Sequence, residues 1–167
     1  MSLAKVNQIG RVRKPGKCGK CGLEINKGDP AVRFSVGFRG FVQTRCTKPE
    51  CFPKPSERES SLVADVYAAQ ESVDHSTAGS LEELTQARDD MVTATQEVAG
   101  QYEDSEMYDR NEDLQERAEV LNSAAEALEQ WEPEGEEPEG GDAEAYEVWL
   151  EAARESLQGA IDEMELP

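Results

Sequence analysis

Four cysteines are the residues of this chain whose type and spacing point most directly to chemistry. Cys18 pairs with Cys21 across two residues and Cys46 pairs with Cys51 across four, with 24 residues between the pairs. Two close pairs at these spacings suit a tetrahedral ion that is gripped by two short loops, and thiolate sulfur is a preferred ligand of Zn²⁺. The sequence therefore predicts one zinc ion bound by Cys18, Cys21, Cys46 and Cys51.

The residues around the cysteines favour this interpretation over the other uses of clustered thiols. Gly19 and Gly22 permit a tight turn, and flanking lysines and arginines favour the thiolate form. The alternatives are two disulfides, four free thiols or an iron–sulfur cluster. The N-terminal segment lacks the apolar stretch of a secretory signal, so we expect a reducing compartment in which disulfides are disfavoured. Charged, hydrophilic flanks argue against an iron–sulfur cluster, and His75 is expected to be a surface histidine.

A β-hairpin is predicted between the two cysteine pairs. Residues 31–38 alternate between apolar and other side chains, residues 39–40 form a turn, and residues 41–45 return as a second strand. The apolar side chains of the first strand are Val32, Phe34, Val36 and Phe38. We expect their face to cover the metal-site side, because so small a segment needs the ion as its main staple. The predicted fold class is a small α+β zinc-binding module followed by an all-α acidic region.

Residues 14–56 resemble a PARP-type zinc finger, a treble-clef finger being the alternative. The resemblance rests on the first cysteine pair, the hairpin with its arginine, and the motifs Ile25-x-Lys27-Gly28 and Cys51-Phe52. It implies a module that binds DNA ends and breaks, largely through backbone contacts and stacking. The chain departs from the family at its third ligand, which is Cys46 in place of a histidine closer to the last cysteine. The family's Trp-Tyr-His run is absent, and Arg33 lies two positions later than the family's arginine.

Charge divides the chain into two parts. Residues 1–58 contain 13 Lys and Arg against 4 Asp and Glu, whereas residues 59–167 contain 4 Arg, no Lys and 32 Asp and Glu. A net charge of +9 over the first part is a credible electrostatic footprint for nucleic-acid phosphates, or a surface that pairs with the acidic part. The candidate nucleic-acid-binding residues are Lys20, Lys27, Arg33, Arg39 and Arg45.

Two aromatic residues flank the predicted hairpin turn. Phe38 and Phe41 can stack on an exposed base, or they can form a small core with Val32 and Phe34. The core is the interpretation that we favour.

The part after residue 55 is predicted to be helical and acidic. We expect a first helix over residues 56–73, and a second that begins at the capping box Ser80-x-x-Glu83, continues to Val98 and is interrupted at Gly100. A coiled-coil-like seam then repeats every seven residues, at Met107, Leu114, Leu121 and Leu128. A turn at residues 100–105 makes the second helix and the helix that carries the seam an antiparallel hairpin. The seam also offers a surface for a homodimer.

The C-terminal part is predicted to be a linker and one helix. Residues 131–142 combine two prolines, three glycines and many acids, which is typical of a mobile linker. Residues 143–167 carry an apolar stripe of Tyr146, Leu150, Ala153, Leu157, Ile161 and Met164. The helix either folds back on the hairpin, which we favour, or serves as a ligand for a partner's groove. The predicted domains are therefore residues 1–55, 56–130, 131–142 and 143–167.

These features predict a binding protein rather than an enzyme. The chain has one histidine and no phosphate-binding glycine loop, and four thiolates leave a zinc ion no open position for water. We expect a zinc finger that binds nucleic acid, with an acidic tail that regulates it or recruits a partner. The alternative is a protein–protein adaptor, or an inhibitor that mimics nucleic acid, of the kind found among bacteriophage accessory proteins. A hydrophobic fraction of 37% and a mean hydropathy of −0.71 make a large shared core unexpected. No apolar run approaches the roughly 20 residues that cross a bilayer, and the N-terminal segment lacks a secretory signal, so we expect a cytoplasmic protein, or a nuclear one in a eukaryote.

Overall fold

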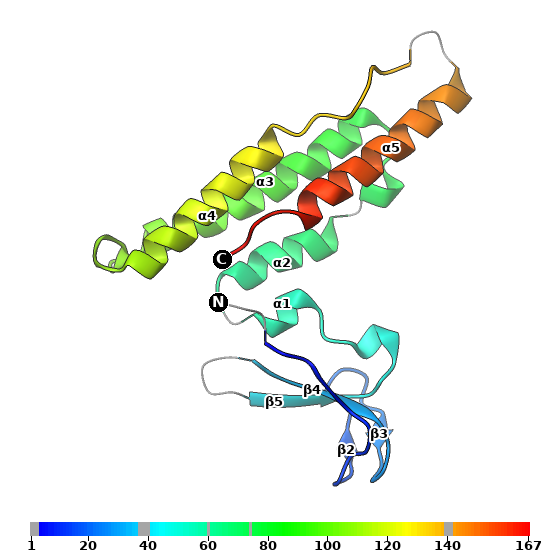
Figure 1. The fold of residues 1–167 in the computed structure, drawn as a ribbon, viewed down its shortest axis with the longest axis vertical. Helices are drawn as coiled ribbons and strands as arrows, with labels where there is room; N and C mark the ends of the chain where they lie inside the picture. Colours follow the sequence, from blue (N-terminus) through cyan, green and yellow to red (C-terminus); the bar gives the residue numbers. More distant parts are fainter. Residues whose placement is uncertain (1–3, 37–40, 60, 74, 139–141) are drawn as a thin grey trace. The chain divides into compact units, whose positions relative to one another are not determined.

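A computed structural model gives the fold of the chain over residues 4–36, 41–59, 61–73, 75–138 and 142–167 (Figure 1). The chain forms two compact units, Met1–Tyr67 and Ala68–Pro167, which we call unit 1 and unit 2. The boundary falls within helix α2, Val63–Ser72, rather than at residue 55 where we expected the first part to end.

Unit 1 is built on two small antiparallel sheets. The larger has the order β1-β4-β5 and consists of strands Asn7–Ile9, Ala31–Val36 and Phe41–Arg45. The smaller pairs β2, Gly16–Lys17, with β3, Glu24–Ile25. The predicted hairpin is present as β4 and β5, with Val32 opposite Arg45 and Val36 opposite Phe41. Its turn, with Phe38 and Arg39, lies outside the described residues. A 3₁₀ turn at Pro49–Cys51 and helix α1, Pro55–Arg58, follow.

The two faces of the larger sheet differ from the expected arrangement. Val32 and Phe34 are each only 2% exposed, yet they lie outside the buried cluster that contains the cysteines. That cluster consists of Val12, Cys18, Ile25, Ala31, Cys46 and Cys51, with Ile9 packed against it. Because side chains alternate along a strand, Ala31 and Val32 project to opposite faces. The prediction that the Val32 and Phe34 face covers the metal site is therefore wrong.

Phe41 also differs from the favoured interpretation. Its side chain is 70% exposed, and that of Val42 beside it is 65% exposed. Phe41 is the first residue of β5 and lies opposite Val36. The prediction that Phe41 joins a small core with Val32 and Phe34 is wrong.

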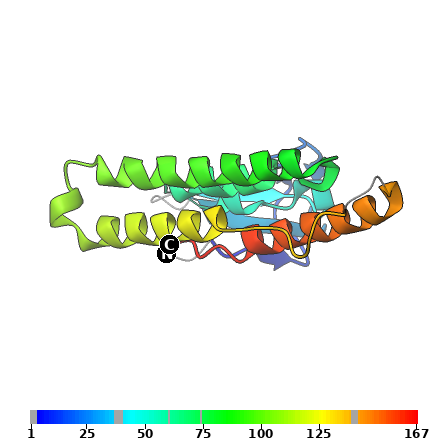
Figure 2. The same cartoon turned by 90° about the horizontal axis from the view of Figure 1, so that it is seen from above.

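Unit 2 is a helical bundle. Its main elements are α3, Leu81–Glu103, α4, Glu112–Glu129, and α5, Ala143–Asp162, with 3₁₀ turns at His75–Thr77 and Tyr108–Arg110. Figures 1 and 2 show α3 and α4 side by side and antiparallel, joined by the turn around residues 104–111. The buried stripe of α3 is Leu84, Met91, Thr95, Val98 and Tyr102, and that of α4 is Ala118, Leu121, Ala125 and Leu128. The steps are seven, four, three and four residues in α3 and three, four and three in α4, so each stripe occupies one face of its helix.

The helix boundaries follow from local capping. Ser80 Oγ accepts the backbone N–H of Glu83 at 3.2 Å, as the predicted capping box requires. α3 continues through Gly100 to Glu103, so the predicted interruption at Gly100 is wrong. Asn111 Oδ1 caps α4 by accepting the Asp113 N–H, and Met107, which we expected in the seam, is 55% exposed in the turn before that helix.

The helix predicted over residues 56–73 is two helices. Glu59, which ends α1, has an extended backbone with ψ of 143°. Ser61 Oγ then accepts the N–H of Val63 at 3.3 Å, where α2 begins. The extended backbone at Glu59 and the capping bond at Ser61 thus outweigh the continuous helical pattern of the sequence.

α5 folds back within unit 2, as we favoured. Asp142 Oδ1 accepts the N–H groups of Glu144 and Ala145 at its start. The buried side chains of α5 are Leu150, Ala153, Leu157 and Ile161. Gln70 Nε2 donates to the carbonyl of Ile161 at 3.0 Å, and Trp131 Nε1 donates to Ser156 Oγ at 3.2 Å. Trp131, which we had placed in the linker, is only 8% exposed, whereas residues 132–138 form no helix or strand.

Candidate metal centre and basic groove

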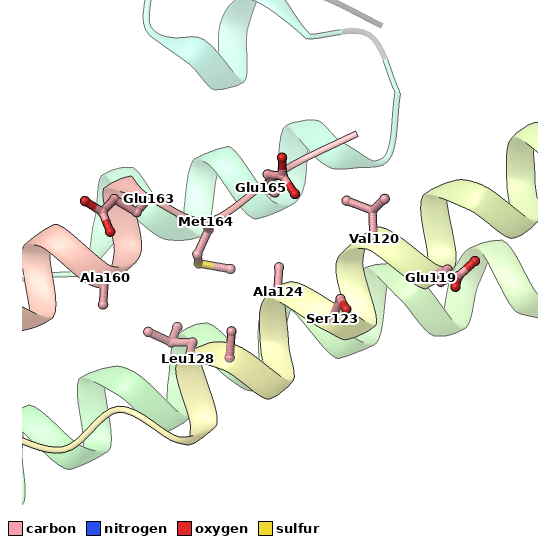
Figure 3. A pocket seen from close by; sticks show the side chains of 10 residues that line it. Glu119, Val120, Ser123, Ala124, Leu128, Ala160, Glu163, Met164 and Glu165 are labelled. Atoms are coloured by element: carbon pink, nitrogen blue, oxygen red, sulfur yellow. The ribbon is translucent and has the colours of Figure 1, made fainter.

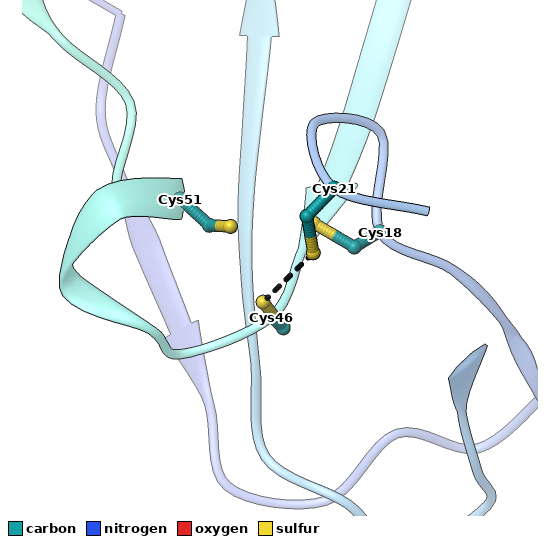
Figure 4. Close-up of side chains that lie close together, drawn as sticks. All are labelled: Cys18, Cys21, Cys46 and Cys51. Atoms are coloured by element: carbon teal, nitrogen blue, oxygen red, sulfur yellow. Dashed lines mark hydrogen bonds between the residues drawn. The ribbon is translucent and has the colours of Figure 1, made fainter. Parts of the chain in front are cut away.

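The four predicted ligands come together in unit 1 (Figure 4). Their Sγ atoms all lie within 4.8 Å of one another, and those of Cys21 and Cys46 are 3.7 Å apart. Four sulfurs around one zinc ion, each at about 2.3 Å, are separated by about 3.8 Å in a tetrahedron. A disulfide requires about 2.05 Å, and all four cysteines are free. The cysteines are thus close enough together to hold a metal ion.

The first loop owes its shape to its glycines. Gly22 has φ of +73°, a left-handed conformation that glycine adopts without strain, and its N–H donates to the Cys18 carbonyl at 3.0 Å. The Cys18 N–H donates to Leu23 at 2.8 Å, which closes the turn. Gly19 N–H donates to the Thr44 carbonyl at 2.9 Å, and this bond ties the loop to β5 beside the second cysteine pair.

The second loop is a short 3₁₀ turn. Pro49 occupies its first turn, where a missing N–H costs nothing, and the Cys51 N–H donates to the Lys48 carbonyl at 2.9 Å. This turn returns Cys51 toward Cys46, which directly follows β5. Four residues between the two cysteines are therefore enough to reverse the chain and bring both sulfurs to one point.

Electrostatics at the cluster calls for a cation. Burial disfavours ionisation of Cys18, but backbone N–H groups from Cys21, Cys46 and Lys20 donate to its sulfur, and the pKa of Cys18 falls to about 6. Burial, with hydrogen bonds among the four thiols, raises the pKa of Cys51 to about 12. Thiolates held this close together repel one another unless a positive ion compensates them. A soft divalent cation satisfies all four sulfurs, and these donors suit zinc or iron.

The ligand set is closed within the described residues. The four cysteines are the only group there of three or more His, Cys, Asp or Glu side chains close enough together to share one ion. Cys18, Cys46 and Cys51 are buried, and Cys21 is exposed. His75, which we expected to be no ligand, belongs to unit 2 and is not in this group.

The predicted nucleic-acid-binding residues differ in how exposed they are and in whether they are paired with a carboxylate. Lys27 and Arg33 are exposed, and Lys20 is partly exposed with its Nζ 4.0 Å from Glu57 Oε1. Arg45 is only 5% exposed: its Nη1 and Nη2 donate to the two carboxylate oxygens of Glu57 at 2.7 and 2.9 Å. Arg39 lies outside the described residues. Arg45 is buried and paired with Glu57, so the prediction that it is an exposed nucleic-acid contact is wrong.

A groove with basic walls lies beside β4 and β5. Its volume is about 520 Å³, and its lining includes Lys14, Lys17 and Arg33 but no acidic residue. The remaining lining residues are Val12, Pro15, Gly16, Gly19, Ile25, Val42, Gln43 and Thr44. Lys14 and Lys17 are not in the predicted set. Their position on either side of Pro15-Gly16, just before the first cysteine, is the sequence signal that points to them.

No helix in the part of the chain that the structure describes is long and apolar enough to cross a membrane. No protein family, curated protein or solved structure matches this chain. The resemblance to PARP-type and treble-clef zinc fingers therefore stays a prediction, and the argument for function rests on the metal centre and the groove.

Proposed function

We propose that unit 1 is a non-enzymatic, zinc-stabilised module that binds the phosphate backbone of nucleic acid in its basic groove. The observation that carries the proposal is the lining of that groove, with three cations and no acid next to the loops that hold the metal. Phosphate contacts need cations that face one channel and are not already paired with carboxylates.

The groove suits a polyanion in shape as well as in charge. Arg33 Nε donates to Thr44 Oγ1 at 3.2 Å, which orients the guanidinium and leaves its terminal nitrogens for a phosphate. Gly16 carries no side chain, and nothing lies within 4 Å of where its Cβ would be, so a backbone can approach between Lys14 and Lys17. Contacts of this kind position a nucleic acid without reading its sequence.

An exposed aromatic side chain at the start of the same strand favours a nucleic acid with accessible bases. Val42 lines the groove, whereas Phe41, the residue before it on β5, projects to the other face of the sheet and is 70% exposed. A nucleic acid that extends past this end of β5 can stack an unpaired base on the ring, because every base has a π-face. The proposed ligand is therefore single-stranded nucleic acid or a frayed duplex end.

The zinc ion has a structural role in this proposal. Four thiolates complete a tetrahedral shell, so no coordination position remains for water or substrate. Its contribution is to fix the loop that carries Lys17 against β5, through the bond from Gly19 to Thr44. The ion thus builds the groove without touching the ligand.

The test is fluorescence anisotropy of a labelled oligonucleotide with the zinc-loaded full chain. At about 50 mM salt, K14Q/K17Q is expected to weaken binding about tenfold and to lower the slope of log affinity against log salt by about two. The matched control is K5Q/K48Q, which removes two exposed lysines of unit 1 from outside the groove. Equal losses in both variants, or no binding by the unmodified chain, would contradict the proposal.

Regulation by the acidic part follows from its charge. Unit 2 contains 4 Arg against 30 Asp and Glu, and it is tethered to a cationic module. A tethered polyanion competes with nucleic acid at high effective concentration. Replacing Glu132, Glu134, Glu136 and Glu137 with glutamine is expected to tighten oligonucleotide binding severalfold at low salt. Unchanged affinity would remove these residues from the competition.

A further inference from the structure

A groove with acidic edges runs along unit 2 between α4 and the end of α5 (Figure 3). It has a volume of about 660 Å³. One wall comes from α4, and the other from the last turn of α5 and the three residues that follow it. Figure 3 shows Met164 directed toward Ala124 and Leu128 across this space.

The walls of the groove are apolar and regularly spaced. Val120, Ala124 and Leu128 are each four residues apart on α4, so they form one stripe along about 12 Å of that helix. Ala160, in the last turn of α5, and Met164, just beyond that helix, lie on the opposite wall. Three of the ten lining residues are alanine, and small side chains let another helix approach closely. A helix of two to three turns, with apolar residues three and four apart, matches this spacing.

The edges of the groove carry unpaired negative charge. Glu119, Glu163 and Glu165 line it, and none of them forms an ion pair within the described residues. No arginine of unit 2 lines the groove. Three of its four arginines are bonded elsewhere, Arg88 to Asp89, Arg117 to Asp113 and Arg154 to Glu147.

We propose that this groove binds a basic amphipathic helix of a partner protein. The apolar face of that helix packs on the α4 stripe and Met164, and its lysines or arginines meet Glu119, Glu163 and Glu165. Charge selects this occupant over the others. Nucleic acid and anionic lipid are repelled by the edges, and the helices of a second copy of unit 2 are themselves rich in acid. The inference does not depend on nucleic-acid binding by unit 1.

The probe is a fluorescein-labelled helical peptide of leucine and lysine, with leucine three and four residues apart. Its controls are the same pattern with glutamate in place of lysine, and the same composition in scrambled order. The full chain is expected to bind the first peptide at least tenfold more tightly than either control. Equal binding of the scrambled peptide would mean general charge attraction and would overturn the proposal.

Two matched variants test whether the peptide binds in the groove. Ala127 lines the groove and Ala152 lies outside it on α5, and both are exposed, so A127K and A152K change the charge equally. We expect A127K to weaken peptide binding about tenfold and A152K less than twofold, with unchanged helical circular dichroism in both. Equal effects would contradict the site.

The role of the rim carboxylates is tested in the same way. E119Q/E163Q is expected to weaken binding about fivefold, and E97Q/E116Q, which neutralises exposed carboxylates outside the groove, is not. Sedimentation gives the remaining outcome: a dimer of the unmodified chain that A127K abolishes would assign the groove to a second copy and overturn the proposal.

Discussion

Arg45 and Glu57 are joined by two parallel hydrogen bonds of 2.7 and 2.9 Å, so that the end of β5 is tied to helix α1. The guanidinium of Arg45 also lies 4.9 Å from the centre of the buried Phe34 ring. Glu57 Oε2 accepts the Lys54 N–H at 2.9 Å as well, which fixes the start of α1. One carboxylate therefore satisfies a buried cation and caps a helix, directly next to the Cys46 and Cys51 loop.

Replacing Glu57 with glutamine is expected to destabilise unit 1 by about 2 kcal/mol at pH 7, because a buried guanidinium loses its charged partner. Denaturant unfolding of the zinc-loaded chain, followed at unit 1 by hydrogen exchange, measures this. The control is E50Q, since Glu50 is exposed and its nearest cation, Lys48 Nζ, is 4.0 Å away. A loss as small as that of E50Q would mean that the pair contributes nothing.

The Arg45–Glu57 pair also makes the stability of unit 1 depend on pH. The hydrogen bonds from Arg45 lower the pKa of Glu57 to about 2 against an ordinary 4.5, so its ionised form stabilises the fold. That stability is fully present above about pH 4.5 and is lost as the pH falls through about 2. The difference in unfolding free energy between the unmodified chain and E57Q should therefore be constant from pH 7 to 5 and narrow below that. A difference that grows on acidification would contradict the assignment.

Removing the metal is expected to unfold unit 1 and to leave unit 2 folded. The hydrophobic cluster around the cysteines is small, so we expect it to need the ion, whereas α3, α4 and α5 have their own core. Both tryptophans, Trp131 and Trp149, lie in unit 2 and report on it alone. Elemental analysis should find about one zinc per chain. A chelator, or C51S, should abolish exchange protection in residues 7–58 without changing tryptophan emission. Protection that survives metal removal would make the ion dispensable.

Replacing Phe41 with alanine distinguishes a role of this side chain in ligand binding from a role in stability. F41A is expected to leave stability within about 0.5 kcal/mol, because the ring is 70% exposed. It should weaken single-stranded oligonucleotide binding about tenfold through the loss of one stacked base. L23A, at a side chain that is 47% exposed, outside the groove, is the control. Anisotropy titrations with equal affinities for the two variants would leave Phe41 without a role in binding.

The packing of α5 predicts a contrast between two of its side chains. Leu157 is fully buried and Val148 is 66% exposed. L157A should cost unit 2 about 3 kcal/mol by leaving a cavity, and V148A less than about 0.5 kcal/mol. Thermal unfolding followed by tryptophan emission measures both losses, since Trp131 bonds to Ser156 next to Leu157. Similar unfolding midpoints for L157A and V148A would mean that α5 does not pack as described.

Local patterns in the sequence determined much of this protein. The paired cysteines identified four side chains that come close enough together to hold one metal ion. Strict alternation identified β4, and the capping residues Ser80 and Asp142 marked where α3 and α5 begin. Each of these signals acts over a few residues, because turn geometry, strand pleating and capping bonds are made by near neighbours. The sequence also separated a basic part from an acidic one, since charge depends only on composition.

The tertiary structure decided what each side chain faces. The residues next to Arg45 in the sequence suggest an exposed cation, yet Arg45 is buried because it pairs with Glu57, twelve residues later. Lys14 and Lys17 line the same groove as Arg33, and the bond from Gly19 to Thr44 ties the first cysteine loop to β5 there. Phe41 is left exposed at a strand end, and the stripe of α4 forms a groove only where α5 ends beside it. These are contacts between distant segments, and their partners are fixed by packing in three dimensions rather than by the period of any one stretch.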